Sequence, residues 1–441
     1  MTPTVGIVAD DLTGANDTAV QFAVQGWVTL LSLRPLAPQV VAGRKGVGAG
    51  DVEVIAVTTD SRASGDGAAA STETAVEDLV AAGISRLYVK IDSTMRGSVA
   101  AQVRGALESW THHHPQAFAV VCPAYPEMGR TVVDAVVGVD GEPLEDGPAG
   151  ADPVTPVTTS LLSELLPGSV HVPAPDSGDP RELADALKKR GADHRVLTAD
   201  AATADDLDLV AQAVTLLGPQ AVPAGSAGLA TALARVTPST RPRPPAGNPS
   251  SDPRRPGAEH RGPVVALVTS LHRTARAQQE RLREAFAGRI LHLCPTLDDL
   301  RDEDAFSRWR TAAPGPRDET EVVLVLAPER TPGPDVVDAG DVARRLAVVV
   351  DDVRRASGTS ALVVTGGDGA RAVVDLWACL GIGVQGAVRE GVPRGVLVGG
   401  DADTLPIITK AGGFGDAETL VEAVRHLLAE VAPDRAVTSR P

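Results

Sequence analysis

Aromatic residues are scarce in this chain of 441 residues, which contains 4 Trp, 2 Tyr and 5 Phe. Proteins that stack on nucleic-acid bases need aromatic faces, so this scarcity argues against that role. The net charge of −16, from 41 Lys and Arg against 57 Asp and Glu, argues the same way because it repels polyanions. We therefore expect no nucleic-acid partner and hydrophobic cores filled mainly by Ala, Val and Leu.

Cysteine is also rare. Cys122, Cys294 and Cys379 are far apart and odd in number, which fits neither a disulfide framework nor the spacing of zinc ligands. No apolar run approaches the roughly 18 residues that cross a bilayer, and the N-terminus lacks a signal-peptide pattern. We expect a cytoplasmic protein without a membrane partner. The sequence leaves the oligomeric state open, a homo-oligomer included.

Length and composition predict two domains. The chain exceeds the roughly 250 to 300 residues that a single core supports. At residues 237–263, TPSTRPRPPAGNPSSDPRRPGAEHRGP, eight prolines and several Gly, Ser and Arg leave almost nothing to bury. We interpret this stretch as a linker between a first domain at 1–236 and a second domain at 264–441.

Short apolar runs alternate with longer Ala-rich segments of helical periodicity in both domains. The apolar runs are nearly continuous, as expected for strands covered on both faces. This rhythm predicts two α/β domains with mostly parallel sheets, joined by the Pro-rich linker. The predicted strands are VGIVAD, VEVIAVTTD, RLYVKID, AFAVVCP, HRVLTAD and AVPAGS in the first domain, and VVALVTS, EVVLVLAP and ALVVTGGDG in the second.

Two neighbouring carboxylates, Asp10 and Asp11, follow the first predicted strand. Ligands of open parallel sheets collect at the carboxyl ends of strands, so polar residues at such positions are candidates for a site. One aspartate or Thr13 can instead cap the helix that follows, a purely structural role. Two successive carboxylates are harder to explain in this way, because their side chains point to opposite sides and only one is free to cap.

Two further strand ends carry charged residues. Lys90 and Asp92 stand two positions apart with Arg96 in the next turn, and Arg62 follows another predicted strand. Guanidinium and ammonium groups bind a carboxylate, and aspartates bind hydroxyls, so this mixture suits a small polyhydroxylated anion. An ion-pair network without a ligand is the alternative.

Glycine-rich turns follow two predicted strands of the second domain. TGGDGARAVV, residues 365–374, leads into a helix, where glycines let the backbone approach a phosphate and the helix N-terminus favours negative charge. PIITKAGGFGD places Lys410 before a similar turn. Ordinary tight connections are the alternative for both.

Two other patterns do not predict a site. GIGVQG, residues 381–386, matches G-x-G-x-x-G but follows a helical pattern, so we interpret Gly381 as a helix C-cap and predict no dinucleotide fingerprint. The histidines at 112–114 lie at a predicted helix end. We expect them to be solvated, because consecutive residues converge poorly on one ion, and we predict no protein metal site.

Several motifs together resemble those of the four-carbon acid sugar kinase family: ADDLTGA, TTDSRA, KIDSTMRG, CPAYPEMGRTV, DPVTP, GSAGLA, TGGDG and KAGGFG. The resemblance implies an N-terminal domain that binds an acid sugar and a C-terminal domain that binds ATP. It implies an acid-sugar site made of Asp10, Asp11, Arg62, Lys90, Asp92 and Arg96. It also implies a nucleotide site made of Ser270, Gly366, Gly367, Asp368, Gly369, Lys410 and Gly412.

The expected activity is ATP-dependent phosphorylation of a hydroxyl of a tetronate or 3-oxo-tetronate, across a cleft between the domains and with Mg²⁺ bridging the phosphates. Asp10, Asp11 or Asp92 would be the catalytic base, with Asp11 slightly favoured. The sequence does not determine which stereoisomer or which hydroxyl reacts.

Two departures from the family pattern affect the nucleotide loops. Thr269 and Leu271, in TSLHRT, stand in a loop where relatives usually have Gly-Ser and a further Ser. Gly369 replaces the Thr of a usual Gly-Gly-acidic-Thr turn, and the loss of that hydroxyl predicts weaker ATP or metal binding. The alternative function is therefore a non-catalytic acid-sugar-binding protein with a degenerate nucleotide site.

Overall fold

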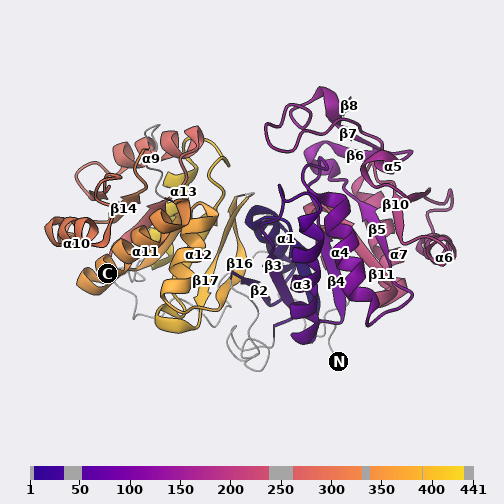
Figure 1. Ribbon diagram of the computed structural model, residues 1–441, viewed down its shortest axis with the longest axis horizontal. Helices are drawn as coiled ribbons and strands as arrows, with labels where there is room; N and C mark the ends of the chain where they lie inside the picture. The colour runs from indigo at the N-terminus through magenta and orange to yellow at the C-terminus, as the bar shows by residue number, and fades with distance from the viewer. Residues whose placement is uncertain (1–3, 34–51, 238–261, 330–337, 390, 432–441) are drawn as a thin grey trace, which may run out of the picture. The chain divides into compact units, whose positions relative to one another are not determined.

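The computed structural model describes residues 4–33, 52–237, 262–329, 338–389 and 391–431. These residues form two compact units, one within Met1–Ser250 and the other within Ser251–Pro441 (Figure 1). Most of the expected linker at 237–263 lies outside the described residues. Within the described ranges, no helix is long and apolar enough to cross a membrane.

A parallel sheet forms the centre of the first unit, and all six strands predicted there are confirmed. Its strands are almost completely buried, and the core is filled mainly by Ala, Val and Leu, as expected. Their spatial order is β2 (Thr29–Ser32), β3 (Val54–Thr58), β1 (Val5–Ala9), β4 (Arg86–Lys90), β11 (Ala221–Gly225), β5 (Phe118–Cys122), β10 (Val196–Ala199) and β9 (Val170–Val172).

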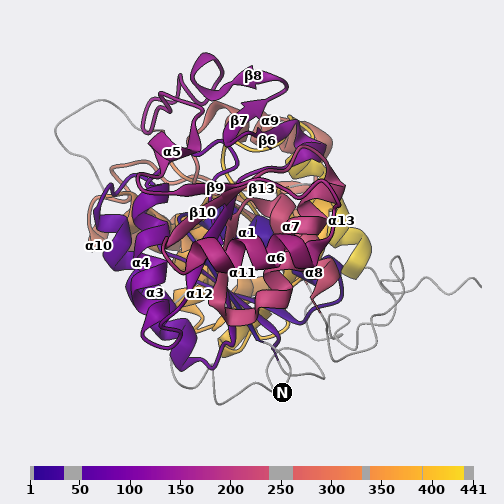
Figure 2. The same ribbon diagram turned by 90° about the vertical axis from the view of Figure 1, so that its right-hand side faces the viewer.

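Helices cover both faces of this sheet (Figure 2). The chain runs from β1 to β2 in one direction but from β3 to β4 in the other, so right-handed crossovers place the connecting helices on opposite faces. The reversal at β1 is the kind of switch point where ligands bind. On one face α1 (Leu12–Val24), α8 (Ala227–Val236), α7 (Ala204–Leu217) and α6 (Pro180–Gly191) pack in a row, while α3 (Gly67–Ala81) packs on α4 (Val99–Thr111).

A small antiparallel sheet was not predicted from the sequence. It consists of β6 (Arg130–Val133), β7 (Val136–Val139) and β8 (Glu142–Pro143). Val132 bridges to Ala201, just beyond β10, so this sheet joins the main sheet at the carboxyl end of β10. Short helices accompany it: η2 (Pro126–Met128), η3 (Leu144–Asp146), α5 (Leu162–Leu165) and, before β11, η4 (Gly218–Gln220).

The second unit has its own sheet, and its predicted strands are also confirmed. The sheet is parallel except for β17, which is antiparallel to both neighbours. The order is β13 (Ile290–Leu293), β14 (Val322–Leu326), β12 (Val264–Val268), β15 (Ala361–Thr365), β18 (Pro406–Lys410), β17 (Val392–Val398) and β16 (Gly381–Arg389). The helices are α9 (Arg273–Ala285), α10 (Glu303–Ala312), α11 (Ala339–Ser357), α12 (Gly367–Leu376), η6 (Gly400–Ala402) and α13 (Thr419–Val431).

The interpretation of Gly381 as a helix C-cap was wrong. Helix α12 ends earlier, at Leu376, and Gly381 is the first residue of β16, where it pairs with Val398. The helical pattern stops at Trp377, and a turn through Ala378, which has a φ of 53°, redirects the chain into the strand. A glycine motif inside a strand does not open a helix, so it is still not a dinucleotide fingerprint.

Candidate functional site

The candidate acid-sugar residues of the first unit lie at the carboxyl ends of three adjacent strands. Strand β1 lies between β3 and β4, and Ala9 is in register with Thr58 on one side and Lys90 on the other. The residues that follow these positions therefore emerge at one edge of the sheet. The structure brings all six together, at the switch point of the topology: Asp10, Asp11, Arg62, Lys90, Asp92 and Arg96.

Arg62 is the centre of this cluster. Its Nε and Nη2 donate to the two carboxylate oxygens of Asp10 at 2.8 and 3.1 Å. Its Nη1 lies 2.9 Å from Asp11 Oδ2, and Nη2 lies 3.9 Å from Asp92 Oδ1. Because Asp10 is buried and both of its oxygens bind Arg62, its evident role is to hold the guanidinium in place.

Asp11 caps helix α1 and has a perturbed pKa. Its Oδ1 accepts a hydrogen bond from Gly14 N at 2.6 Å, so it is the N-cap of α1 that the sequence left open between the aspartates and Thr13. Burial raises the pKa of Asp11 above its usual value and the nearby Asp10 charge adds to this, while Arg62 and the cap hydrogen bond oppose the change. A carboxylate with a raised pKa is a stronger base than an ordinary aspartate.

Asp92 is held differently. Its Oδ2 accepts hydrogen bonds from Thr94 Oγ1 at 2.5 Å and from Arg96 Nε at 3.0 Å, and its Oδ1 accepts from Arg96 Nη2 at 3.1 Å. Burial alone would raise the pKa of Asp92, but the hydrogen bonds and charge of Arg96, with the charge of Arg62, bring it below the usual range. Asp92 is therefore a weak base that fixes the position of Arg96.

Lys90 ends β4 and is buried, with 5% of its surface exposed. Its Nζ donates to Ile91 O at 2.9 Å, which uses one of the three donors of an ammonium group. A Cβ at position 14 would lie 3.2 Å from Nζ, so the amine lies beside the start of α1. Lys90 can therefore offer donors to an anion bound next to Asp11.

The candidate nucleotide residues lie at the carboxyl ends of β12, β15 and β18, which are adjacent and parallel. Ser270 and Gly412 are in close contact, since a Cβ at position 412 would lie 1.8 Å from Ser270 Oγ. Gly366, with a φ of 112°, donates its N–H to Lys410 O at 3.0 Å. The three loops thus form one cluster at a switch point between β12 and β15, as expected for a nucleotide site.

The turn after β15 forms the N-terminus of α12. Gly366 is the N-cap, and Gly367, Asp368 and Gly369 form the first turn. The backbone N–H groups of such a turn are available to a phosphate. Burial lowers the pKa of Lys410, at the end of β18, to about 8, and its Nζ donates to Ala411 O at 2.8 Å.

Thr269 and Gly369 lie against each other on neighbouring loops. A Cβ at Gly369 would lie 2.9 Å from Thr269 Cγ2 and 3.0 Å from Thr269 Oγ1. Thr269 Oγ1 donates to Thr365 O at 3.2 Å, which fixes it beside the turn.

Sequence reasoning missed two residues that support the acid-sugar cluster. Thr94 binds Asp92, as described above, and Asp152 Oδ2 accepts from Arg96 Nη1 at 3.3 Å. Asp152 also accepts from the N–H groups of Val154 and Thr155 at 3.0 and 2.8 Å. Thr94 lies in the motif KIDSTMRG and Asp152 in DPVTP, so both residues could have been predicted from these motifs.

Two family models match the chain. The first, a sugar-binding N-terminal domain, matches residues 5–233, and the second, a nucleotide-binding C-terminal domain, matches residues 265–420. The protein therefore combines a sugar-binding and a nucleotide-binding domain.

Curated relatives of this chain have kinase names. The chain is 41% identical over 435 residues to the D-threonate kinase of Bordetella bronchiseptica, with 96% of this chain and 98% of that protein covered. It is 31% identical over 437 residues to the D-threonate kinase of Salmonella typhimurium, with 96% and 97% covered. A solved structure from Haemophilus influenzae shares the fold, with a TM-score of 0.67 at 19% identity and coverage of 96% and 100%. The chain belongs to the four-carbon acid sugar kinase family.

Proposed function

We propose that this protein is an ATP-dependent kinase that phosphorylates a hydroxyl of a four-carbon acid sugar, with D-threonate as the first candidate. Residues 1–236 are the acid-sugar domain and residues 264–441 the nucleotide domain, and the reaction is cytoplasmic because ATP is the donor. The observation that carries the proposal is the convergence of Asp11, Arg62 and Lys90 on one sheet edge, in a chain 41% identical to a D-threonate kinase.

The cations of the first unit suit the carboxylate of the acid sugar. Arg62 is held by Asp10 and Arg96 by Asp92 and Asp152, so both guanidinium groups are oriented before a ligand arrives. Lys90 retains donors for the ligand carboxylate or a hydroxyl. Oriented charges of this kind align the reacting hydroxyl without reorganisation during the reaction.

Asp11 is the general base in this proposal. Asp10 uses both oxygens to hold Arg62, and Asp92 has a lowered pKa, so neither is suited to accept a proton. Asp11 has the raised pKa. Its Oδ1 caps α1, and its Oδ2, which pairs with Arg62 Nη1 at 2.9 Å, would exchange that partner for the attacking hydroxyl. It would accept the proton of the attacking hydroxyl as the bond to the γ-phosphate forms.

The second unit supplies the phosphate contacts. The N–H groups of Gly367 and Gly369, with Ser270 and Gly412 from the neighbouring loops, would contact the phosphates, and the Lys410 amine would add positive charge.

Within the described ranges no group of three His, Cys, Asp or Glu side chains could hold a metal ion. Mg²⁺ carried by ATP needs no such cage, since it is bound mainly by phosphates and water, and Asp368 could add one oxygen. The metal would neutralise phosphate charge.

By the resemblance, relatives usually have a glycine where this chain has Thr269 and a threonine where it has Gly369. Here Thr269 fills the space beside Gly369, which argues that the nucleotide site is functional rather than degenerate. We expect Gly369→Thr alone to raise the KM for ATP at least about tenfold, because the new side chain collides with Thr269. Adding Thr269→Gly should return the KM to within about threefold of the wild-type value, since the two positions are coupled. A double variant whose KM for ATP is as high as that of Gly369→Thr would contradict this coupling.

A coupled assay of ADP release tests the function. We expect turnover with D-threonate, D-erythronate or 3-oxo-tetronate that depends on ATP and Mg²⁺. Calorimetry with ATP alone separates the alternative of a non-catalytic binding protein, which predicts acid-sugar binding without ATP binding. Folded protein that releases no ADP above background with any of these acids would refute the proposal.

A further inference from the structure

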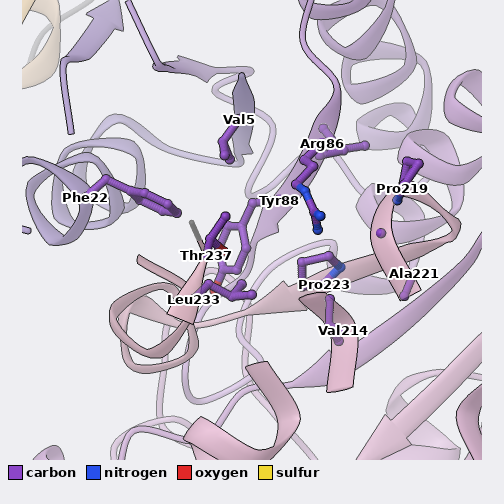
Figure 3. Close-up of a pocket in the computed structure, with 12 residues that line it drawn as sticks. Val5, Phe22, Arg86, Tyr88, Val214, Pro219, Ala221, Pro223, Leu233 and Thr237 are labelled. Carbon is purple, nitrogen blue, oxygen red and sulfur yellow. The ribbon is translucent and has the colours of Figure 1, made fainter. Parts of the chain in front are cut away.

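A pocket lies at the opposite edge of the first sheet from the acid-sugar cluster, at the amino ends of β1, β4 and β11 (Figure 3). Val5 is in register with Arg86 at this edge, while Ala9 is in register with Lys90 at the edge that carries the acid-sugar cluster. Four residue steps along a strand correspond to about 13 Å. The pocket is therefore separate from the site described above.

The walls of this pocket are mainly apolar. Val5 and Phe22 lie on one side, and Val214, Pro223 and Leu233 complete much of the lining (Figure 3). Walls of this kind favour a hydrocarbon group over a polyhydroxylated one, because hydroxyls would lose their hydrogen bonds to water there.

One cation, Arg86, lines the pocket, and its guanidinium points inward (Figure 3). Its side chain makes one long hydrogen bond, from Nη2 to Thr215 O at 3.5 Å. In the part of the chain that the structure describes, no carboxylate lies within ion-pair distance of Arg86. Burial lowers the pKa of Arg86, and no neighbouring acid opposes that change. A half-buried cation without a counter-ion favours the binding of an anion.

The nearest polar group on the same strand face does not serve the pocket. Tyr88 is two residues from Arg86 and lines the same cavity, but its hydroxyl donates to Ser226 O at 2.5 Å. Arg86 is thus the charged side chain among the lining residues that can bind the polar end of a ligand. A guanidinium binds a carboxylate through two parallel N–H···O hydrogen bonds.

We propose that this pocket is a second ligand site that binds a short-chain carboxylate, with the carboxylate on Arg86 and the hydrocarbon against Val5, Phe22 and Leu233. Such a ligand leaves no hydroxyl without a partner and supplies the missing counter-ion. The proposal does not depend on the kinase function, because it concerns the other edge of the sheet.

Ligand-observed NMR with sodium butyrate tests this site in the full-length protein. We expect millimolar binding to the wild type, and at least about tenfold weaker binding to Arg86→Gln, which keeps a polar side chain but removes the charge. Butyramide, the neutral analogue, should also bind at least about tenfold more weakly. Arg86→Lys should retain part of the affinity because it keeps the charge.

The controls distinguish this pocket from other anion sites. Arg104→Gln removes an exposed arginine of the same unit and should leave butyrate binding unchanged. Saturating D-threonate should not displace butyrate. Equal binding to the wild type and a folded Arg86→Gln variant, displacement by D-threonate, or no binding at about 20 mM butyrate would overturn the proposal.

Discussion

Replacing Asp11 with asparagine is expected to lower kcat by about 10²–10⁴-fold, which is the usual contribution of a general base. Asparagine keeps an oxygen that can accept from Gly14 N, and it is as good an N-cap as aspartate, so α1 should remain intact. The variant thus removes the base while preserving the fold. The measurement is steady-state kinetics with D-threonate and ATP, with the melting temperature as a check on folding.

Asp66→Asn is the matched control for Asp11→Asn. Asp66 is an exposed carboxylate of the same unit, and its ion pair with Arg104 is also exposed, so kcat should not change.

The pH dependence of the wild-type enzyme is a second test of Asp11. The pKa of Asp11 is raised, so kcat/KM should fall as the pH decreases through that raised value, because the base becomes protonated. Wild-type kcat in Asp11→Asn would show that the base is another group.

Replacing Gly412 with alanine is expected to raise the KM for ATP by about 10–100-fold. The new Cβ would lie 1.8 Å from Ser270 Oγ and 2.4 Å from Ser270 Cβ. Rotation of the serine side chain moves Oγ but not Cβ, so the two loops must separate, at a cost of about 1–3 kcal/mol. A loss of this size in the free energy of ATP binding corresponds to the expected rise of about 10–100-fold in KM.

The domain organisation makes the Gly412 prediction specific. Calorimetric binding of D-threonate to the first unit should be unchanged in Gly412→Ala, because the substitution lies in the second unit. Gly315→Ala is the matched control, since a Cβ at position 315 meets no atom within 4 Å. An unaltered KM for ATP in Gly412→Ala, or an equal increase in Gly315→Ala, would rule out the proposed nucleotide loops.

The sequence predicted the parallel sheets well because their strands are buried on both faces. Runs such as VVALVTS and ALVVTGGDG are apolar throughout, and they became β12 and β15. The sequence analysis did not predict β2, β9, β13, β16 and β17 of the two large sheets. It also missed β6, β7 and β8, which are short and partly exposed. Gly381 was misinterpreted because a glycine after a helical pattern is typical both of a C-cap and of a chain that turns into a strand.

The sequence predicted which residues gather at each sheet edge but not what each one does there. Position after a parallel strand was enough to bring Asp10, Asp11 and Arg62 together. The role of each carboxylate depends on interatomic distances that the sequence does not give. Both oxygens of Asp10 bind Arg62, whereas Asp11 caps α1. The contact between Thr269 and Gly369 was equally invisible, since the two residues are 100 positions apart in the chain.

The position of D-threonate in a crystal structure of the complex tests the central claim most directly. We predict that it binds at the carboxyl ends of β1, β3 and β4, with one hydroxyl within hydrogen-bond distance of Asp11 and with contacts to Arg62 and Lys90. D-threonate bound elsewhere on the protein, with these three side chains still facing only one another, would contradict the account.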